Sequence, residues 1–388
     1  ARLRGPGPWA TIHAPLPEGS NRMTPSTDDL RIQQARPLIT PWVLAEELPL
    51  TETLAAQIAG QRRTVEAILA SNDPRLLVVV GPCSVHDTDA LLDYAQQLKT
   101  ACEPLTDALF PVLRVYFEKP RTVVGWKGLI NDPDLDGSFH INKGLHLARK
   151  VLLDVAAMGL PAATEFLDTT FGQYYADLVS FGAIGARTVE SQIHRELASG
   201  LSMPVGFKNG TTGDISVAID AIRSASHSHW FPSITKEGTP AVLHSSGNPH
   251  GHLILRGGRD TGPNYHAGAV REAAAALAGK DLAASVIVDA SHGNSEKNHE
   301  RQGLVIADLC DQLEQGQSAL RGVMLESHLL AGNQPLADAG ELTYGQSITD
   351  ACLSLEQTVP LLEQLAAAGR RRRGCPPAAR TGVAHPEH

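Results

Sequence analysis

The chain has 388 residues, 42% of them hydrophobic and 19% charged, and a chain of this size can bury a large core without disulfides or structural metals. Its formal net charge of −9 argues against nucleic acid as a partner. The longest purely apolar run, Leu76 to Val80, is far shorter than a membrane span, so we expect no membrane partner. The five cysteines contain no Cys-x-x-Cys pair, which favours free thiols and a cytoplasmic location.

The two ends of the chain differ in composition from its middle. Residues 1–22 are rich in Pro and Gly without periodicity, and residues 370–388 begin with four arginines. We predict that residues 1–28 and 370–388 are disordered extensions. We expect residues 29–70, which precede the first apolar run, to mediate oligomerisation or regulation. Residues 71–369 then form the catalytic domain.

Residues 71–369 alternate between short apolar runs and segments of helical periodicity. The apolar runs predict eight buried strands, at Leu76–Val80, Val112–Phe117, Pro161–Thr164, Ala183–Ala186, Pro204–Phe207, Leu253–Leu255, Val286–Val288 and Gly322–Leu325. The helical segments are Thr51–Ala70 before the first strand, then Asp89–Thr100, Ile141–Met158, Gly172–Ser180, Glu190–Gly200, Asp214–Ala225, Ala267–Ala278 and Asn298–Gln315. Eight such repeats favour a (β/α)8 TIM barrel over an open doubly wound sheet. Residues 230–251 interrupt the sixth unit and predict an inserted β-hairpin.

Charged residues follow the predicted strands at their carboxyl ends, where barrels keep their active sites. The third strand runs into the acid Glu165, and six cations occupy the other ends, namely Arg114, Lys119, Arg121, Arg187, Lys208 and Arg256. Each cation alone has an ordinary alternative, a salt bridge at a strand end. Six on one face would be costly to desolvate unless anions compensate them. Since arginine and lysine suit phosphate and carboxylate groups, we expect two anionic substrates.

A second group of residues has the chemistry of a metal site. Cys83, His292, Glu326 and Asp350 offer a thiolate, an imidazole and two carboxylates, a mixed set that suits one divalent ion of Mn, Fe, Co or Zn. Their linear spacing matches no known metal motif. Each residue also has a simpler alternative, such as a buried thiol, a hydrogen-bonded core histidine or a helix cap.

Seven motifs, in this order along the chain, match those of a known family. They are GPCSVHD from residue 81, RVYFEKPRT from 114, GWKG from 125, GAIGAR from 182, GFKNGT from 206, LRGG from 255 and SITDA from 347. Together they resemble the type I 3-deoxy-D-arabino-heptulosonate 7-phosphate (DAHP) synthases over residues 29–369. The resemblance implies the first step of the shikimate pathway, in which phosphoenolpyruvate, D-erythrose 4-phosphate and water give DAHP and phosphate.

The resemblance also implies roles for individual residues. It implies a divalent ion held by Cys83, His292, Glu326 and Asp350. It places phosphoenolpyruvate among Arg114, Lys119, Ala186, Arg187, Lys208 and Arg256, with Glu165 close by, and the aldose phosphate on Arg121 and Thr122. The catalytic group is then Arg114, Lys119, Glu165, Cys83 and His292, with Lys119 donating a proton or positioning the water.

Many relatives are inhibited by an aromatic amino acid, and the matching positions here are Gln173, Leu197, Leu201, Ser202, Phe231 and Ser233. Ser233 favours Phe as the effector, because a side chain there would crowd the hydroxyl of tyrosine. Gly172, where relatives often have proline, weakens this assignment and leaves Tyr or Trp open. The same residues could instead form a simple packed hairpin. By the same resemblance, we expect a homodimer or homotetramer.

Two other functions remain open at this stage. A 3-deoxy-D-manno-octulosonate 8-phosphate synthase would use the same phosphoenolpyruvate with a pentose phosphate, but the sequence from Lys119 to Thr122 speaks against it. A catalytically silent sensor barrel would have lost a metal ligand or a phosphate-binding cation. The sequence shows no such loss.

Overall fold

The computed structural model describes residues 27–121, 125–336 and 341–374. The chain divides into two compact units, residues 1–39 and 40–388, and this boundary falls inside the predicted 29–70 extension. Residues 27–39 contain no helix or strand, only a turn in which the Ile32 amide donates to the Asp29 carbonyl. No helix in the described part of the chain is long and apolar enough to cross a membrane.

Eight parallel strands close into a barrel, which confirms the predicted fold class. Each strand pairs with the next one along the ring, and the last pairs with the first. The strands are β1 (Leu76–Gly81), β2 (Leu109–Arg114), β3 (Ala162–Glu165), β4 (Phe181–Ile184), β5 (Val205–Lys208), β8 (Gly251–Leu255), β9 (Val286–Asp289) and β10 (Leu320–His328). All eight overlap predicted strands. β2 lies nearer the amino terminus than predicted, because Leu109 and Phe110 pair with Leu76 and Leu77 of β1. β4 also begins earlier, and β10 is longer than predicted at both ends.

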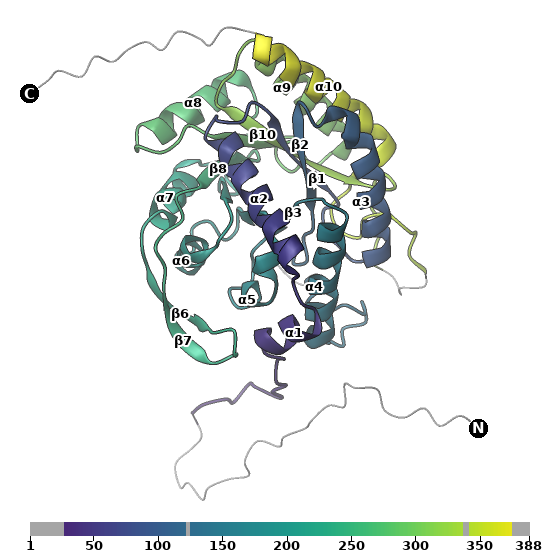
Figure 1. The fold of residues 1–388 in the computed structure, drawn as a ribbon, viewed down its shortest axis with the longest axis vertical. Helices are drawn as coiled ribbons and strands as arrows, with labels where there is room; N and C mark the ends of the chain where they lie inside the picture. Colours follow the sequence, from purple (N-terminus) through teal and green to yellow (C-terminus); the bar gives the residue numbers. More distant parts are fainter. Residues whose placement is uncertain (1–26, 122–124, 337–340, 375–388) are drawn as a thin grey trace, which may run out of the picture. The chain divides into compact units, whose positions relative to one another are not determined.

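The barrel interior is filled by alternate residues of the strands. Leu77, Val79 and Met324 belong to one buried cluster, as expected when every second side chain faces inward. The same cluster includes Val65 and Ile68 of α2 (Glu52–Leu69), the predicted helix before the first strand. Figure 1 shows α2 lying across the barrel, where it covers the amino-terminal ends of the strands.

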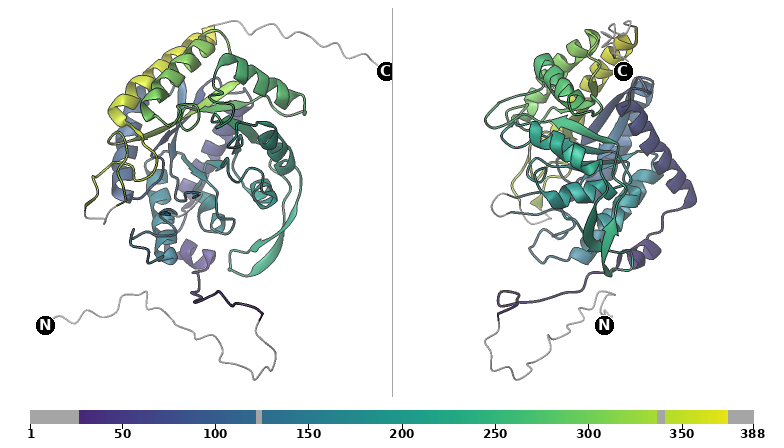
Figure 2. Two further views of the ribbon diagram at one scale, coloured as in Figure 1. Left: turned by 180° about the vertical axis from the view of Figure 1, so that it is seen from behind. Right: turned by 90° about the vertical axis from the view of Figure 1, so that its left-hand side faces the viewer.

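The predicted helices surround the barrel, and the last of them, α9, packs beside a further helix that was not predicted, α10 (Figure 2). They are α3 (Thr88–Cys102), α4 (Ile141–Ala157), α6 (Gln192–Gly200), α7 (Ser216–Ala225), α8 (Ala267–Ala278) and α9 (Gln302–Glu314), joined by α10 (Leu355–Gly374). The helix predicted over 172–180 is shorter. It is one turn, α5 (Gly172–Tyr175), followed by a 3-10 turn, because the backbone leaves helical geometry at Tyr175, where two consecutive tyrosines are both buried.

The inserted hairpin is confirmed. Strands β6 (Trp230–Ile234) and β7 (Pro240–His244) pair antiparallel in a separate two-stranded sheet. The hairpin extends away from the barrel toward α1 (Pro41–Glu47), as Figure 1 shows, and the amide of Trp42 donates to the Lys236 carbonyl at 2.7 Å. The first helix and the hairpin therefore support each other outside the barrel.

The sequence analysis placed the start of the disordered carboxyl-terminal tail too early, at residue 370. Helix α10 continues to Gly374, so residues 370–374 are helical. The guanidinium of Arg370 lies 2.6 Å from Asp107, and Arg372 donates to the carbonyls of Leu320 and Pro74. Arginines in the last turn of a helix are stabilised by its dipole as well as by these partners. Residues 1–26 and 375–388 lie outside the described residues.

Candidate active site

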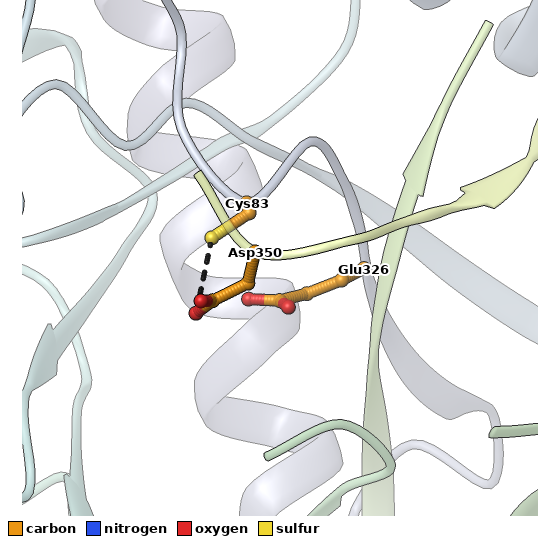
Figure 3. A group of neighbouring side chains, drawn as sticks. All are labelled: Cys83, Glu326 and Asp350. Carbon is orange, nitrogen blue, oxygen red and sulfur yellow. Dashed lines mark hydrogen bonds between the residues drawn. The ribbon is translucent and has the colours of Figure 1, made fainter. Parts of the chain in front are cut away.

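Three of the four predicted metal ligands meet where the barrel closes. Cys83 follows β1, Glu326 belongs to β10, and Asp350 precedes the short strand β11 (Leu353–Ser354). Strand pairing places Gly81 opposite Glu326, so Cys83 emerges beside this carboxylate. One ligand atom from each of the three residues lies within 4.8 Å of the others, with Cys83 Sγ 3.6 Å from Asp350 Oδ2 (Figure 3).

The fourth predicted ligand, His292, borders this group. Its Nε2 lies 3.7 Å from Glu326 Oε1, and its Nδ1 lies 3.1 Å from Asp289 Oδ2. His292 takes a φ of +57°, a left-handed backbone conformation that is uncommon outside glycine and is often found at functional sites. The structure therefore brings three of the predicted ligands together, with His292 beside them through its contact with Glu326.

Asp289, at the end of β9, is a site residue that the sequence analysis missed. It is fully buried, its Oδ2 lies 3.0 Å from Lys208 Nζ, and its Oδ1 accepts from the Ser291 hydroxyl at 2.6 Å. Burial opposes its charge, but Lys208 and His292 outweigh it and hold the pKa of Asp289 well below its usual range. A carboxylate on one imidazole nitrogen orients the other nitrogen toward a metal. Its position at a strand end was the available signal.

Arg114, the last residue of β2, is fully buried beside the predicted metal ligand Glu326. Its Nη2 donates to Glu326 Oε1 at 3.1 Å, its Nε donates to the Pro82 carbonyl, and its guanidinium lies 4.1 Å from the centre of the Tyr116 ring. Its Nη1 is buried and has no hydrogen-bond partner in the described part of the chain. A buried charged donor without a partner is costly, so this nitrogen marks a place for an anionic ligand.

Lys119 contacts Cys83 directly. Its Nζ lies 3.0 Å from Cys83 Sγ and donates to the Cys83 carbonyl at 3.2 Å. Burial disfavours the charge of Lys119, but Cys83, Glu326 and Asp350 outweigh it and raise the pKa of the lysine. Burial, followed by the charge of Glu326, raises the pKa of the Cys83 thiol to about 11. A metal ion would remove this proton, since cysteine binds metals as thiolate, and the thiol, imidazole and two carboxylates fit a borderline divalent ion.

Two more predicted cations, Arg187 after β4 and Arg256 after β8, lie close enough to repel each other. Burial lowers the pKa of Arg256, and the charge of Arg187 lowers it further, which indicates that the two guanidinium groups face one region. The backbone amide of Arg256 donates to Asn209 Oδ1 at 2.8 Å, while Arg187 Nη1 donates to the Pro120 carbonyl at 3.4 Å. Asn209 is fully buried, and the sequence analysis missed this support.

Glu165, at the end of β3, is the central carboxylate among these cations. It contributes to the electrostatic environment of Lys119, Lys208 and Arg256. Gly185 makes room for it, because a Cβ at this glycine would lie 2.1 Å from Glu165 Oε1. Ala186 follows and is half-buried.

The predicted aldose phosphate site is only partly described. Arg121 is exposed, and its Nε donates to the Trp126 carbonyl at 2.7 Å. Thr122 lies outside the described residues. The site can therefore be followed only as far as Arg121.

The six predicted effector residues lie on α5, at α6 and on the hairpin. Phe231 of β6 packs on α6, since a Cβ at Gly200 would lie 3.5 Å from its ring, and Leu197 of α6 is also buried. Lys236 at the hairpin tip donates to the carbonyl of Gln173 in α5. The other three are Ser233, which pairs with Ala241 across the hairpin, and Leu201 and Ser202, which follow α6.

A (β/α)8 barrel with clustered cations, a central carboxylate and a mixed thiol, imidazole and carboxylate donor set defines a class of protein. It is a metal-dependent barrel enzyme for anionic substrates.

Comparison with known proteins specifies this class further. Residues 52–363 match the DAHP synthetase I family, and the chain belongs to it. The chain is 55% identical over 352 residues to the Phe-sensitive phospho-2-dehydro-3-deoxyheptonate aldolase of Escherichia coli K12, covering 91% of this chain and 100% of that protein. It is 53% identical to the Trp-sensitive enzyme of Salmonella typhimurium, covering 88% and 98% of the two chains. A solved aldolase structure of the same name from Francisella tularensis superposes with a TM-score of 0.86 at 50% identity, covering 88% of this chain and 100% of the other.

Proposed function

We propose that the cations and carboxylates at the mouth of this barrel catalyse the condensation of phosphoenolpyruvate with D-erythrose 4-phosphate and water. As a member of the DAHP synthetase I family, the chain is a 3-deoxy-7-phosphoheptulonate synthase, which forms DAHP and releases phosphate in the first step of the shikimate pathway. The observation that supports the residue roles best is the convergence of buried cations around Glu165, with Arg114 Nη1 buried and unpartnered.

In this proposal phosphoenolpyruvate binds among Arg187, Arg256 and Lys208, with Ala186 beside it. Guanidinium groups bind phosphate and carboxylate bidentately, and the mutual repulsion of Arg187 and Arg256 would be relieved by an anion between them. Arg114 Nη1 would take the remaining carboxylate or phosphate oxygen. Glu165 would hold the cations in place without neutralising all of them.

Arg121 and Thr122 would bind the phosphate of the aldose, leaving its aldehyde near Lys119. A bond forms between C3 of phosphoenolpyruvate and the aldehyde carbon, water adds at C2, and phosphate leaves with the bridging oxygen. Lys119, whose pKa is raised by the surrounding anions, stays protonated and can donate to the developing alkoxide or position the water.

The residues that would hold the ion are Cys83, His292, Glu326 and Asp350. When bound, a divalent ion of Mn, Fe, Co or Zn would act as a Lewis acid on the aldehyde carbonyl. Asp289 would orient His292, and Arg114 would hold the Glu326 carboxylate in position through their contact at 3.1 Å.

The deciding experiment compares two aldose phosphates with metal-supplemented protein. Phosphate release from phosphoenolpyruvate is expected with D-erythrose 4-phosphate and should be far slower with D-arabinose 5-phosphate. The reverse preference would favour the octulosonate synthase. No release with either would favour the silent sensor.

We further propose that an aromatic amino acid, Phe before Tyr or Trp, binds between α5, α6 and the hairpin. The packing of Phe231 against α6 and the contact of Lys236 with Gln173 hold the hairpin against α6 and α5, which supports a binding site formed by all three elements. Inhibition by each of the three amino acids tests this, and Ser233→Gly should admit tyrosine while the exposed Ser246→Gly should not. If Phe has no effect on the wild-type enzyme, the assignment is wrong.

A homodimer or homotetramer in the cytoplasm completes the proposal. Large exposed apolar side chains on α1 and the hairpin, Trp42, Val43, Trp230 and Val242, support an interface at this end of the molecule. Light scattering of the purified protein tests the oligomer. A monomer at micromolar concentration would contradict it.

A further inference from the structure

A pocket of about 320 Å³ opens at the amino-terminal end of the barrel. It is bordered by Leu69 at the end of α2, by Ser71 before β1, by Ala283 and Ala319 before β9 and β10, and by Ala274 of α8. Figure 1 looks onto this end, where the end of α2 lies beside α8 and β10. The metal ligands and cations described above follow the opposite, carboxyl ends of the same strands, so the pocket is a separate place on the molecule.

Arg321 is directed to this pocket by an irregularity in β10. Leu320 pairs with Val286 of β9, whereas Gly322 pairs with the next residue, Ile287. Arg321 is therefore an extra residue in the ladder, a bulge of the kind that redirects a side chain. Arg271 of α8 contributes a second guanidinium to the lining. Two arginines thus share one small pocket.

No carboxylate lines the described part of this pocket. Burial and, to a lesser extent, the positive charge of Arg372 on α10 together lower the pKa of Arg321 to about 10. The end of α2 supplies the partial negative charge of a helix C-terminus, but its last carbonyls already accept the amides of Ala70, Ser71 and Asn72. Among the described residues that line the pocket, the net charge is therefore positive.

We propose that this Arg321 pocket binds a small organic anion with one phosphate or carboxylate group. The anionic group would lie between the guanidinium groups of Arg321 and Arg271, which bind such groups in a fixed planar geometry. The small organic body would contact the apolar wall formed by Leu69 and the alanines. A pocket of this size accepts a ligand of a few carbons beyond the anionic group.

The test is a calorimetric titration of the full-length protein with inorganic phosphate, phenyl phosphate and benzoate. Because the proposed active site also binds phosphate, the titrations are repeated with Arg187→Gln, which weakens that site and leaves the pocket intact. Phenyl phosphate should bind the pocket more tightly than inorganic phosphate because of the apolar wall. Comparison with benzoate shows whether phosphate or carboxylate is preferred.

Arg321→Gln and Arg271→Gln should each weaken phenyl phosphate binding about tenfold or more, the loss expected for one charged hydrogen bond. Arg223→Gln removes an exposed arginine of α7 outside the pocket and should change nothing. Since Arg271 is exposed, its variant keeps the test valid if the Arg321 variant folds poorly. Turnover at saturating substrates should be unchanged in both. Equal binding by wild type and both pocket variants, or no binding of any probe, would overturn the proposal.

Discussion

The ammonium of Lys119 lies 3.0 Å from the sulfur of Cys83. The lysine follows β2 and the cysteine follows β1, so the closed sheet brings a proposed proton donor against a proposed metal ligand. A thiolate at Cys83 would stabilise the charge on Lys119, and the lysine would in turn favour the thiolate. With the proposed roles, metal binding and proton chemistry would be coupled through this one contact.

Removal of the Cys83 thiol should abolish metal retention. We expect Cys83→Ala to lose bound metal and activity with a nearly unchanged circular dichroism spectrum, because the barrel core does not depend on this side chain. The metal content of wild type and Cys83→Ala, measured by mass spectrometry, checks this prediction. Cys102→Ala is the matched control, since Cys102 is also buried but lies at the end of α3. Equal metal content in wild type and Cys83→Ala would count against the site.

Asp289→Asn should weaken both the metal site and the proposed phosphate site, because the carboxylate contacts His292 and Lys208. A residue that orients a metal ligand typically contributes about 10- to 100-fold to metal affinity or activity. Metal titration followed by kcat/KM for phosphoenolpyruvate measures the two effects. Asp220→Asn, at an exposed position on α7, should leave both values unchanged. An unaffected metal affinity in Asp289→Asn would contradict this role.

Arg256→Ala should impair the use of phosphoenolpyruvate more than that of the aldose phosphate. Losing a charged hydrogen bond of about 1.5–3 kcal/mol predicts roughly a 10- to 100-fold rise in the KM for phosphoenolpyruvate. Arg121→Ala should show the opposite pattern. Steady-state kinetics with each substrate varied in turn tests the division, and equal effects of both variants on both substrates would disprove it.

His252 should make the fold sensitive to acid. Its ring is buried beside Phe181, and burial lowers its pKa to about 4, against about 6.5 in an unfolded chain. Its contribution to stability is therefore complete above about pH 6.5 and is lost as the pH falls toward 4. This one group should lower the free energy of unfolding by about 2 kcal/mol between pH 7 and pH 5.

Urea unfolding of wild type and His252→Gln at both pH values isolates this effect. The neighbouring His250 is present in both proteins and so does not contribute to the difference between them. The variant should lose less stability than wild type on acidification, whatever its stability at pH 7. Identical pH dependence of the two proteins would show that His252 is not the responsible group.

Local patterns predicted the barrel strands well, because a parallel strand buried on both faces has a continuous apolar run. The same patterns predicted the ends of helices less well where contacts with distant residues decide the backbone conformation. The helix at 172–180 shortens where Tyr174 and Tyr175 both turn inward, and the arginines after residue 370 extend α10 because they find partners such as Asp107. Neither contact has a signal in the neighbouring sequence.

Sequence alone determined the order of strands and helices and the chemistry at each strand end, since both follow from residues a few positions apart. Only the tertiary structure decided what these ends do together. Pairing of β1 with β10 brings Cys83 to Glu326, and burial of Asp289 between Lys208 and His292 gives it a role that depends on contacts between residues far apart in the sequence. The bulge that directs Arg321 toward its pocket likewise depends on the register between β9 and β10. Periodicity is a property of neighbouring residues, whereas distances between strand ends are set by closure of the hydrogen-bonded sheet.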